Sequence, residues 1–367
     1  MKFSIERDAL RAALGQVSSA IATKSTLPIL ANVLITAGPG RIGFNATDLD
    51  VAVSVSAPGE VETQGEITLP AKRLQEIAKQ AAEGVVRFSA GPEGRVAVEA
   101  GKARFKLLGL PTSEFPNFPK VDFKGGPTLP AATIQLLVEQ VAFAASSEQS
   151  RPILSGVLWE FRPDRMSMVA TTGHKLAALD VPYQGGAKAD VIVPVKALEL
   201  VRKLFAEDAQ VEVTQNGNHI GFRSGDTVVL SRLIEGPYPN YAQVLPKGND
   251  KSVTLDTAAF LAALKRVTIV ASQQTYLVTL TSTEKGLRLS TQTPDTGEAQ
   301  ESVAGAWEGE PIVIGINASY LIDMLRRVPT PEVRMTFKSP ERVMTVEPVK
   351  WEDPATWLGL VMPLRIA

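Results

Sequence analysis

The fold is decided by the stretch Pro28-Ile29-Leu30 and the residues that follow it at Ala46-Thr47, Pro70, Lys72 and Leu74, because the same pattern is repeated 124 residues later. The second copy reads Pro152-Ile153-Leu154, Ala170-Thr171, Pro194, Lys196 and Leu198. A third, more divergent copy has Val313-Ile314-Gly315-Ile316-Asn317 where the second has Val193-Pro194-Val195-Lys196 and its neighbours. Agreement at separated places along the chain indicates an internal repeat of one fold.

An amphipathic helix is predicted at the start of each copy. The apolar stripes are Leu10, Ala13, Leu14 and Val17; Ile134, Leu137, Val138 and Val141; and Phe260, Ala263, Leu264 and Val267. A second helix is expected over 72–80, 196–205 and 317–328. A repeat of about 120 residues is too long for a solenoid and suits an independent domain. We therefore expect three domains, 1–124, 125–247 and 248–367, with joints near 123–127 and 247–250.

Short β-branched runs separated by Gly, Pro or Asn lie between the helices. In the first copy they cover 33–36, 41–44, 51–55, 85–88, 96–99 and 103–108. Gln215-Asn216-Gly217-Asn218 has the composition of a hairpin turn. The sequence predicts an α+β fold, in which each domain has two helices and roughly eight strands and the helices cover one face of antiparallel sheet.

Composition excludes several classes of protein. The 367 residues include no cysteine, which excludes disulfides and thiolate chemistry and favours a reducing compartment. The start, Met1-Lys2-Phe3-Ser4, lacks the apolar core of a signal peptide, and no run approaches the ~20 apolar residues of a membrane span. We expect a cytoplasmic protein that does not contact membranes.

The basic residues concentrate in the predicted helices. A net charge of −1 is unusual for a nucleic-acid binder, but the acids lie mainly in strands and turns such as 60–62 and 295–301. The second helices carry Lys72, Arg73 and Lys79; Lys196, Arg202 and Lys203; and Arg326 and Arg327. The first helices add Arg7, Arg11, Lys265 and Arg266.

With these features in place, the chain resembles the bacterial DNA polymerase sliding clamps, the β subunits of the replicative polymerase. The most specific pieces are Met1-Lys2-Phe3, Thr26-Leu27-Pro28-Ile29-Leu30, Ala46-Thr47-Asp48-Leu49, Ala170-Thr171-Thr172-Gly173-His174-Lys175-Leu176-Ala177, Tyr238-Pro239-Asn240-Tyr241 and Val361-Met362-Pro363-Leu364-Arg365. The resemblance covers the whole length. It implies a non-catalytic processivity factor, a head-to-tail homodimer whose six domains close a ring around duplex DNA, with helices lining the hole.

The resemblance places a set of residues at DNA-facing positions: Lys24, Lys72, Arg73, Glu148, Gln149, Arg151 and Lys196. To these we add Arg202 and Lys203 of the same helix as Lys196. Base contacts worth ~1–3 kcal/mol would trap a sliding ring, whereas phosphate contacts are sequence-blind. Lys24 and Lys72 stand where the family often has Arg, which keeps the charge and loses bidentate geometry. Taken singly, each cation also fits an ordinary solvated helix face.

The resemblance also implies an apolar cleft between the second and third domains that receives short linear peptides. In the family these come from the polymerase α subunit, the clamp loader, other polymerases and repair proteins. The matching residues are Leu154, Thr171, Gly173, His174, Lys175, Leu176, Pro239, Gln243, Val244, Leu360, Met362, Pro363, Leu364 and Arg365. Burying two or three apolar anchors at ~25 cal/mol per Å² gives exchangeable affinity. The family commonly has Arg at 175, Asp at 172 and, in some members, Arg at 243, so peptide preference is open. Residues 360–364 also fit an ordinary last strand.

Ring closure needs complementary edges on the first and third domains. By the resemblance, Arg95, Lys102, Arg104 and Phe105 face Ile269, Val270, Glu298 and Glu301, with Asp295 nearby. Opposite charges would meet there, and a head-to-tail contact built from three domains per chain closes with two chains. Charged residues on an edge strand can equally serve to prevent aggregation.

An enzyme is the main alternative class. Two histidines, His174 and His219, and no cysteine offer little for a metal site, and no Gly-rich loop ends in Gly-Lys-Ser/Thr. Asp48 and Asp50 are the best carboxylate pair for a hydrolase or metal-dependent nuclease, but their repeat partners, Thr172 and His174, carry no carboxylate. We therefore expect no cofactor and no metal. A peptide-binding scaffold without DNA is the other alternative, and it gives no reason for matched cations in three repeats.

Overall fold

The computed structural model describes residues 1–22, 25–117, 119, 121–148, 150–185, 188–351 and 354–366. The backbone forms two compact units, Met1–Gln135 with Lys196–Leu233, and Leu136–Val195 with Ile234–Ala367. The middle repeat contributes to both units. Each unit is therefore a mixture of consecutive repeats, held together by strand pairing.

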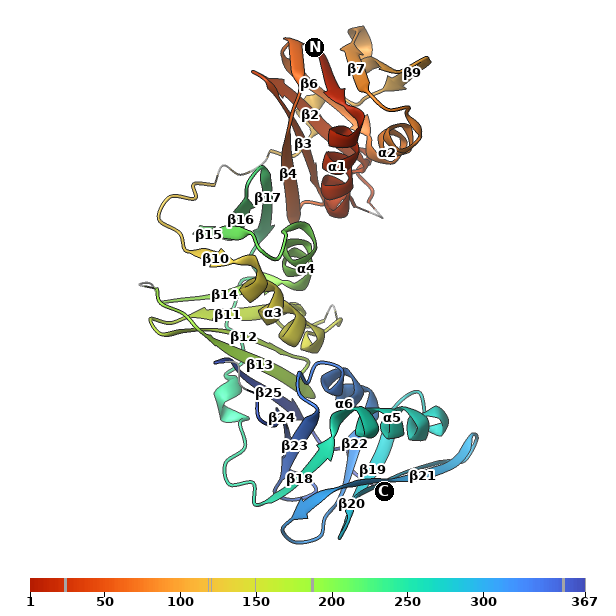
Figure 1. Ribbon diagram of the computed structural model, residues 1–367, viewed down its shortest axis with the longest axis vertical. Helices are drawn as coiled ribbons and strands as arrows, with labels where there is room; N and C mark the ends of the chain where they lie inside the picture. The colour runs from red at the N-terminus through yellow and green to blue at the C-terminus, as the bar shows by residue number, and fades with distance from the viewer. Residues whose placement is uncertain are drawn as a thin grey trace. The chain divides into compact units, whose positions relative to one another are not determined.

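Unit 1 contains two antiparallel sheets. The first has the order β5-β1-β7-β8-β9 and the second β10-β15-β16-β17-β4-β3-β2-β6 (Figure 1). The strands of the first are β1 Lys2–Glu6, β5 Glu60–Thr63, β7 Val85–Ala90, β8 Arg95–Ala100 and β9 Ala103–Leu108. Those of the second are β2 Asn32–Gly38, β3 Arg41–Thr47, β4 Val51–Pro58, β6 Gly65–Pro70, β10 Thr128–Pro130, β15 Gln210–Asn216, β16 His219–Ser224 and β17 Thr227–Arg232.

Three helices of this unit carry the predicted cations: α1 Arg7–Val17, α2 Ala71–Gln80 and α4 Val195–Leu204, the last from Lys196 onward. The apolar stripe of α1 is buried, as predicted, and α1 packs against α2 and β4. The side-chain amide of Gln75 donates to the carbonyl of Leu14 at 3.2 Å and joins the two helices. The cations of α2 and α4 and Arg11 of α1 are exposed, whereas the Arg7 side chain is only 19% exposed.

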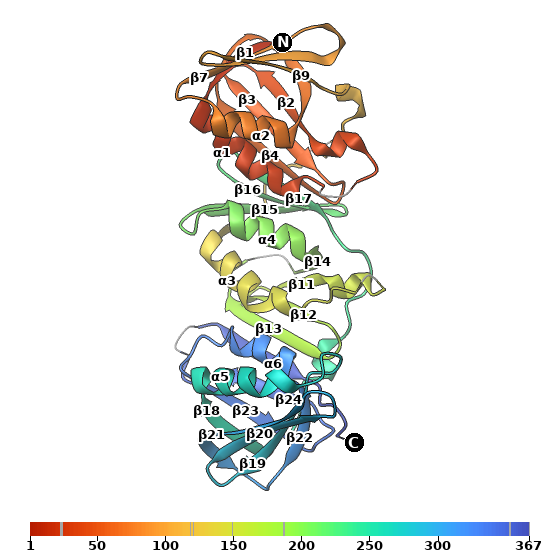
Figure 2. The ribbon, with the colours of Figure 1, turned by 90° about the vertical axis from the view of Figure 1, so that its right-hand side faces the viewer.

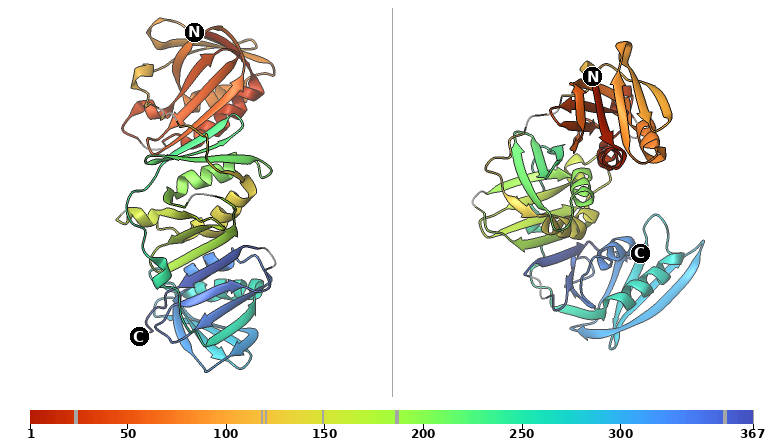
Figure 3. Two further views of the ribbon diagram at one scale, coloured as in Figure 1. Left: turned by 90° about the vertical axis from the view of Figure 1, so that its left-hand side faces the viewer. Right: turned by 45° about the horizontal axis from the view of Figure 1, so that its top comes forward.

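The joint between the first and second repeats is a strand pair inside unit 1. Strand β17 runs antiparallel to β4, with Leu230 opposite Ala52 and Ser231 opposite Val51. The green strands β15, β16 and β17 thus continue the sheet of the red strands β2, β3 and β4 (Figure 3).

Unit 2 contains a twelve-stranded sheet of order β14-β11-β12-β13-β25-β24-β23-β18-β21-β20-β19-β22. Its strands are β11 Gly156–Phe161, β12 Arg165–Thr171, β13 Lys175–Pro182, β14 Ala189–Pro194, β18 Lys251–Asp256, β19 Leu277–Thr283, β20 Gly286–Thr293, β21 Gly297–Glu308, β22 Val313–Asn317, β23 Glu332–Phe337, β24 Met344–Pro348 and β25 Thr356–Val361. Its helices are α3 Ala131–Val141, from Leu136 onward, α5 Thr257–Val267 and α6 Ala318–Leu325. Helices α5 and α6 lie side by side against the strands of the third repeat (Figure 2).

The second joint repeats the first. Strand β25 runs antiparallel to β13, with Leu360 opposite Leu176 and Val361 opposite Lys175. Because Leu176 is the repeat partner of Ala52, the same position of the incoming strand meets the same position of the receiving strand at both joints. The repeat seen in the sequence is therefore also a repeat of inter-domain pairing.

The predicted elements are largely confirmed. The repeated Pro-Ile-Leu forms a one-turn helix before β2 (Pro28–Ala31) and again before β11 (Pro152–Ser155). Gly217 has a left-handed backbone (φ 58°) in the hairpin that pairs Asn216 with His219, as its sequence predicted. The prediction missed β1, and it extended the last helix too far. Helix α6 ends at Leu325, and Pro329 disfavours helical backbone at Val328, where the predicted helix ended.

No helix within the described ranges is both long enough and apolar enough to span a membrane.

Candidate functional site

A small apolar cavity of about 130 Å³ lies in unit 2 where the turn between β12 and β13 meets the end of β25. Its lining unites ten of the predicted cleft residues: Leu154, Thr171, Gly173, His174, Lys175, Leu176, Pro239, Val244, Leu360 and Met362. It also includes Asn240, Tyr241 and Val343, which the prediction did not assign to the cleft. Residues from five separate segments therefore converge on one apolar site.

A second cavity of about 490 Å³ shares Val244, Val343 and Met362 with the first. Gln243 lines this cavity and not the first, together with Lys247, Lys338, Glu341 and Arg342. We call the two connected cavities the main groove. It has an apolar end and a polar, predominantly basic end.

Pro363, Leu364 and Arg365 line neither cavity of the main groove as described. Leu364 instead exchanges backbone contacts with Gly315 of β22, donating its N–H to the Gly315 carbonyl at 2.8 Å. Met362 donates its N–H to the carbonyl of His174 at 2.8 Å. The last residues thus anchor the end of β25, so that the Met362 side chain is held in the groove.

The turn that carries His174 is fixed by two threonines. The Thr171 hydroxyl donates to the carbonyl of Lys175 at 2.7 Å and accepts from the N–H of Gly173 at 2.9 Å. Gly173 has a left-handed backbone (φ 90°), which glycine adopts without strain. The Thr172 hydroxyl accepts from the N–H groups of His174 and Lys175, each at 3.2 Å. Thr172 therefore supplies the turn-stabilising acceptor that an aspartate would supply, without the negative charge.

Lys175 is a buried charge at the edge of the groove. Its side chain is 8% exposed, and its ammonium contacts Asp323 of α6 at 2.9 Å. The ammonium also lies 5.4 Å from the ring centroids of Phe143 and Tyr320. His174 stacks on the same Tyr320 ring at 6.5 Å. Lysine thus ties the turn to α6 by an ion pair and cation–π contacts.

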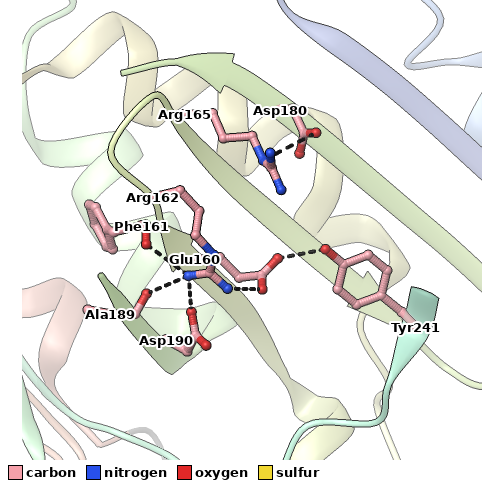
Figure 4. A network of polar contacts seen from close by, with 8 residues as sticks. All are labelled: Glu160, Phe161, Arg162, Arg165, Asp180, Ala189, Asp190 and Tyr241. Carbon is pink, nitrogen blue, oxygen red and sulfur yellow. Dashed lines mark hydrogen bonds and ion pairs between the residues drawn. The ribbon is translucent and has the colours of Figure 1, made fainter. Parts of the chain in front are cut away.

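A polar network fixes the wall that carries Tyr241, Gln243 and Val244 (Figure 4). The Tyr241 hydroxyl donates to one carboxylate oxygen of Glu160 at 2.6 Å, and Arg162 donates to the other oxygen at 2.6 Å. Arg162 also donates to the Phe161 carbonyl at 2.8 Å and pairs with Asp190 of β14. Burial raises the pKa of Tyr241, and its hydrogen bond to Glu160 raises that pKa further, so the phenol remains a neutral donor. The short helix Tyr241–Gln243 is thereby attached to β11 and β14.

The predicted DNA-facing cations differ in their surroundings. Lys72 and Arg73 are exposed on α2, and neither pairs with a carboxylate among the described residues. Lys196 pairs with Asp48, Arg202 with Glu199 at 2.9 Å, and Lys203 contacts the Ser19 hydroxyl at 3.2 Å. Glu148 and Arg151 are exposed, while Lys24 and Gln149 lie outside the described residues. Unit 1 therefore has a cationic helical face on both α2 and α4.

The predicted interface residues lie on two sheet edges. In the described part of the chain, β9 pairs only with β8, and residues 297–304 of β21 pair only with β20. Lys102 is exposed beside β9, and Arg95 lies on β8. Arg104 pairs with Glu99 at 3.3 Å, and Phe105 is partly exposed. Lys106 and Leu108, which the prediction did not name, also lie on β9, and Leu108 is 65% exposed.

The acidic edge is organised by α5. Arg266 forms a two-pronged contact with Glu301 at 2.9 and 2.5 Å, and this contact lowers the pKa of the Glu301 carboxyl. Glu298 is exposed, Ile269 is 79% exposed, and the Val270 carbonyl accepts from the Thr296 hydroxyl at 2.6 Å. One edge of the chain is therefore basic with exposed apolar side chains, and another is acidic with an exposed isoleucine.

One carboxylate of the pair considered for catalysis, that of Asp48, has a structural explanation. Asp48 accepts from the N–H groups of Asp50 and Val51 at 3.1 and 2.8 Å and pairs with Lys196. Within the described ranges, no group of three or more His, Asp or Glu side chains is placed to hold a metal ion.

Comparison with known proteins decides the family. Models of the DNA polymerase III beta subunit match the chain in order: the N-terminal domain over 1–119, the central domain over 128–240 and the C-terminal domain over 242–365. The chain belongs to the DNA polymerase III beta sliding clamp family. It consists of three clamp domains, each with helices packed on antiparallel sheet, and it is a non-catalytic processivity factor of DNA polymerase III.

Individual relatives agree over the full length. The clamp is 33% identical over 377 residues to the beta sliding clamp of Caulobacter vibrioides, covering 100% of both chains. It superposes on the sliding clamp of Bacillus subtilis with a TM-score of 0.95 at 25% identity, again covering both chains completely. It also matches a sliding clamp of Pseudomonas aeruginosa bound to griselimycin, with a TM-score of 0.93, 30% identity and 100% coverage of each chain.

Removing one hydroxyl tests the network in Figure 4. Tyr241→Phe leaves a Glu160 oxygen without its donor, and we expect the free energy of unfolding to fall by about 1–3 kcal/mol. Tyr183→Phe is the matched control, because Tyr183 meets Phe161 edge-on and its hydroxyl has no hydrogen bond to a described residue. Denaturant unfolding of the three proteins gives the comparison. Equal stability of the two variants would contradict the role assigned to the Tyr241 hydroxyl.

Proposed function

We propose that this clamp works in the cytoplasm as a head-to-tail homodimer that encircles duplex DNA without sequence specificity. DNA and a polymerase are partners of a sliding clamp. We propose that the polymerase α subunit, the clamp loader, other polymerases and repair proteins reach the main groove through short linear peptides. The domain boundaries 1–124, 125–247 and 248–367 belong to this proposal, and the matched ranges of the family models support them.

The observation that carries the proposal is the pattern of strand pairing. Each internal joint pairs the last strand of one repeat with the β4-type strand of the repeat before it. By that rule β9, the last strand of the first repeat, should pair with a β4-type strand, and β21, the β4-type strand of the third repeat, should pair with a last strand. Neither has such a partner among the described residues of one protomer. Unpaired edges of opposite charge on one chain fit each other in a second copy. Such a head-to-tail contact closes into a ring if the angle permits.

The internal joints also predict the register of the contact. We extend the pairing of β17 with β4 and of β25 with β13 by one repeat. In this extension Lys106 of β9 takes the place of Leu230 of β17, and Glu298 of β21 takes the place of Ala52 of β4. Because Leu230 lies opposite Ala52, Lys106 of one protomer is predicted to lie opposite Glu298 of its partner. The same register places Phe105 opposite Ala299, on the side of the strand that carries Glu301. Hydrogen bonds between the strands, the Lys106–Glu298 pair and burial of Phe105 and Ile269 would stabilise the dimer.

A charge swap tests this register. Lys106→Glu and Glu298→Lys each place like charges opposite one another, and cross-strand pairs contribute about 0.2–1 kcal/mol each. We expect each single variant to weaken the dimer. The double variant should restore its affinity, because the two exchanged side chains again place opposite charges against each other at both contacts of a head-to-tail ring. Sedimentation equilibrium measures the dissociation constant, with exposed Lys285→Glu as control. A double variant weaker than both single variants would show that the register is wrong.

The cationic helices supply the DNA contact in this proposal. Lys and Arg on α2 and α4 interact with phosphates without reading bases, so the ring is held and still slides. The peptide-scaffold alternative has no use for these exposed cations. Reversing their charge while preserving the dimer therefore separates the two functions.

We expect the combination Lys72→Glu, Arg73→Glu and Lys196→Glu to shorten retention on circular DNA. It should also reduce the salt dependence of binding by roughly one unit of slope per lost contact. Lys285→Glu, Arg288→Glu and Lys350→Glu make the same charge change on exposed residues outside the helices and serve as control. Dimer mass must be the same in both. Equal retention for the two triple variants would exclude the threaded-duplex model.

The main groove supplies the partner contact. A relative from Pseudomonas aeruginosa has been solved bound to griselimycin, and we propose that this clamp binds griselimycin in its main groove. Val244 is 47% exposed and lines both cavities, whereas Val313 of the same unit is 46% exposed and lines neither. These two valines form a matched pair.

Val244→Asp should weaken griselimycin binding by about ten-fold or more, because it places a charge among apolar side chains. Val313→Asp should leave the affinity unchanged. Calorimetric titration of the full-length protein gives both dissociation constants. Unchanged binding to the Val244 variant would place the griselimycin site elsewhere.

A further inference from the structure

A cavity of about 470 Å³ lies at the first joint, entirely within unit 1. Its lining includes Thr47, Leu49, Asp50, Leu230 and Arg232, together with Pro116 and Asn117 of the linker. A shift of 124 residues places Thr47, Leu49 and Asp50 on Thr171, Gly173 and His174 of the main groove. We call this cavity the first-joint groove.

The two grooves share their hydrogen bonding. The Thr47 hydroxyl donates to the Val51 carbonyl at 2.9 Å and accepts from the Leu49 N–H at 3.0 Å, as Thr171 does with Lys175 and Gly173. Arg232 donates its N–H to the Asp50 carbonyl at 2.9 Å, as Met362 does to His174 at 2.8 Å. The linkers also correspond, since Phe115-Pro116-Asn117 precedes one groove and Tyr238-Pro239-Asn240 the other. The first-joint groove is therefore a second copy of the same construction.

The turn of the first-joint groove contains a strained residue. Leu49 has a left-handed backbone (φ 84°) at the position where the main groove has Gly173 (φ 90°). A β-carbon makes this conformation unfavourable, so a leucine here is held against its own preference. The Leu49 side chain is 48% exposed at the rim of the cavity. The turn thus presents an apolar side chain to solvent at the entrance.

The walls differ in charge from those of the main groove. Arg232 stands in place of Met362, is exposed, and has no carboxylate partner among the described residues. His219 pairs with Arg232 across β16 and β17 and also lines the cavity. Asp50 replaces His174 and adds a negative charge to the lining. An acidic ligand group is therefore favoured next to the Arg232 guanidinium and disfavoured next to the Asp50 carboxylate.

From this construction and charge we infer that the first-joint groove is a second docking site for partner proteins, one that takes a short extended peptide carrying an acidic residue next to a large apolar residue. The apolar side chain would contact Leu49 and Leu230, and the carboxylate would pair with the Arg232 guanidinium. The inference rests on the proposed peptide-binding role of the main groove. It gives each protomer two grooves with different charge preferences.

The test uses fluorescein-labelled Gly-Asp-Leu-Phe-Gly and Gly-Lys-Leu-Phe-Gly as probes, with full-length protein whose main groove is disabled by Val244→Asp. We expect the acidic probe to bind this variant saturably, at one site per protomer, and the basic probe to bind several-fold more weakly. Adding Arg232→Glu should weaken the acidic probe by about ten-fold. Adding Arg87→Glu, the same charge change on another exposed arginine of unit 1, should have no effect.

Each remaining outcome has a definite meaning. If Val244→Asp alone abolishes binding of the acidic probe, only the main groove takes peptides, and the inference fails while the proposed function stands. Equal effects of Arg232→Glu and Arg87→Glu would also overturn the inference. Displacement of the probe by a single-stranded oligonucleotide in an Arg232-dependent manner would assign the groove to nucleic acid instead. If neither Val244→Asp nor Arg232→Glu changes binding of the acidic probe, the proposed peptide-binding role of the main groove fails as well.

Discussion

Antiparallel pairing between strands of successive repeats is the interaction on which the rest of this structure depends. An unpaired strand edge exposes a row of N–H and C=O groups, and a sheet protein must cover that row or leave it available to another chain. Here β17 covers β4 and β25 covers β13 by the same register. The two joints are therefore built in the same way, and each creates a groove.

The grooves follow from the way each joint ends. Where two strands from different repeats stop pairing, the turn before the receiving strand, the end of the incoming strand and the linker must come together. At the second joint these parts are the turn of Gly173, the end of β25 at Met362 and the segment of Tyr241. The contacts of Lys175 with Asp323 and Tyr320 fix the turn, and the hydrogen bond from Tyr241 to Glu160 fixes the linker. A binding site thus arises from the joint, and its chemistry depends on a few side chains that the fold leaves free to vary.

Much of this arrangement could be predicted from the sequence, because periodicity and repetition are local signals. The helical stripes and the Asn216-Gly217 hairpin followed from such local patterns, whereas the convergence of His174, Pro239 and Met362 followed from the resemblance to the sliding clamp family. Val343 could not be found, because its place in the groove depends on the pairing of β24 and β25 and not on a nearby motif. The partners of Lys175 were equally out of reach, since Asp323 lies 148 positions away along the chain. The strain at Leu49 leaves no trace in composition, and only comparison with Gly173 makes it visible.

The internal joints of one chain and the contact between protomers in the proposed ring use the same kind of strand pairing, but they differ in chain connectivity. An internal joint connects segments of the same polypeptide, so a pair that separates remains at high effective concentration and re-forms readily. The contact between β9 of one protomer and β21 of its partner has no covalent tether. In the proposed ring, a strand pair that separates at β17 or β25 would therefore re-form more readily than the contact between protomers. The contact between protomers is thus the one kind of joint in the proposed ring at which the polypeptide is not continuous.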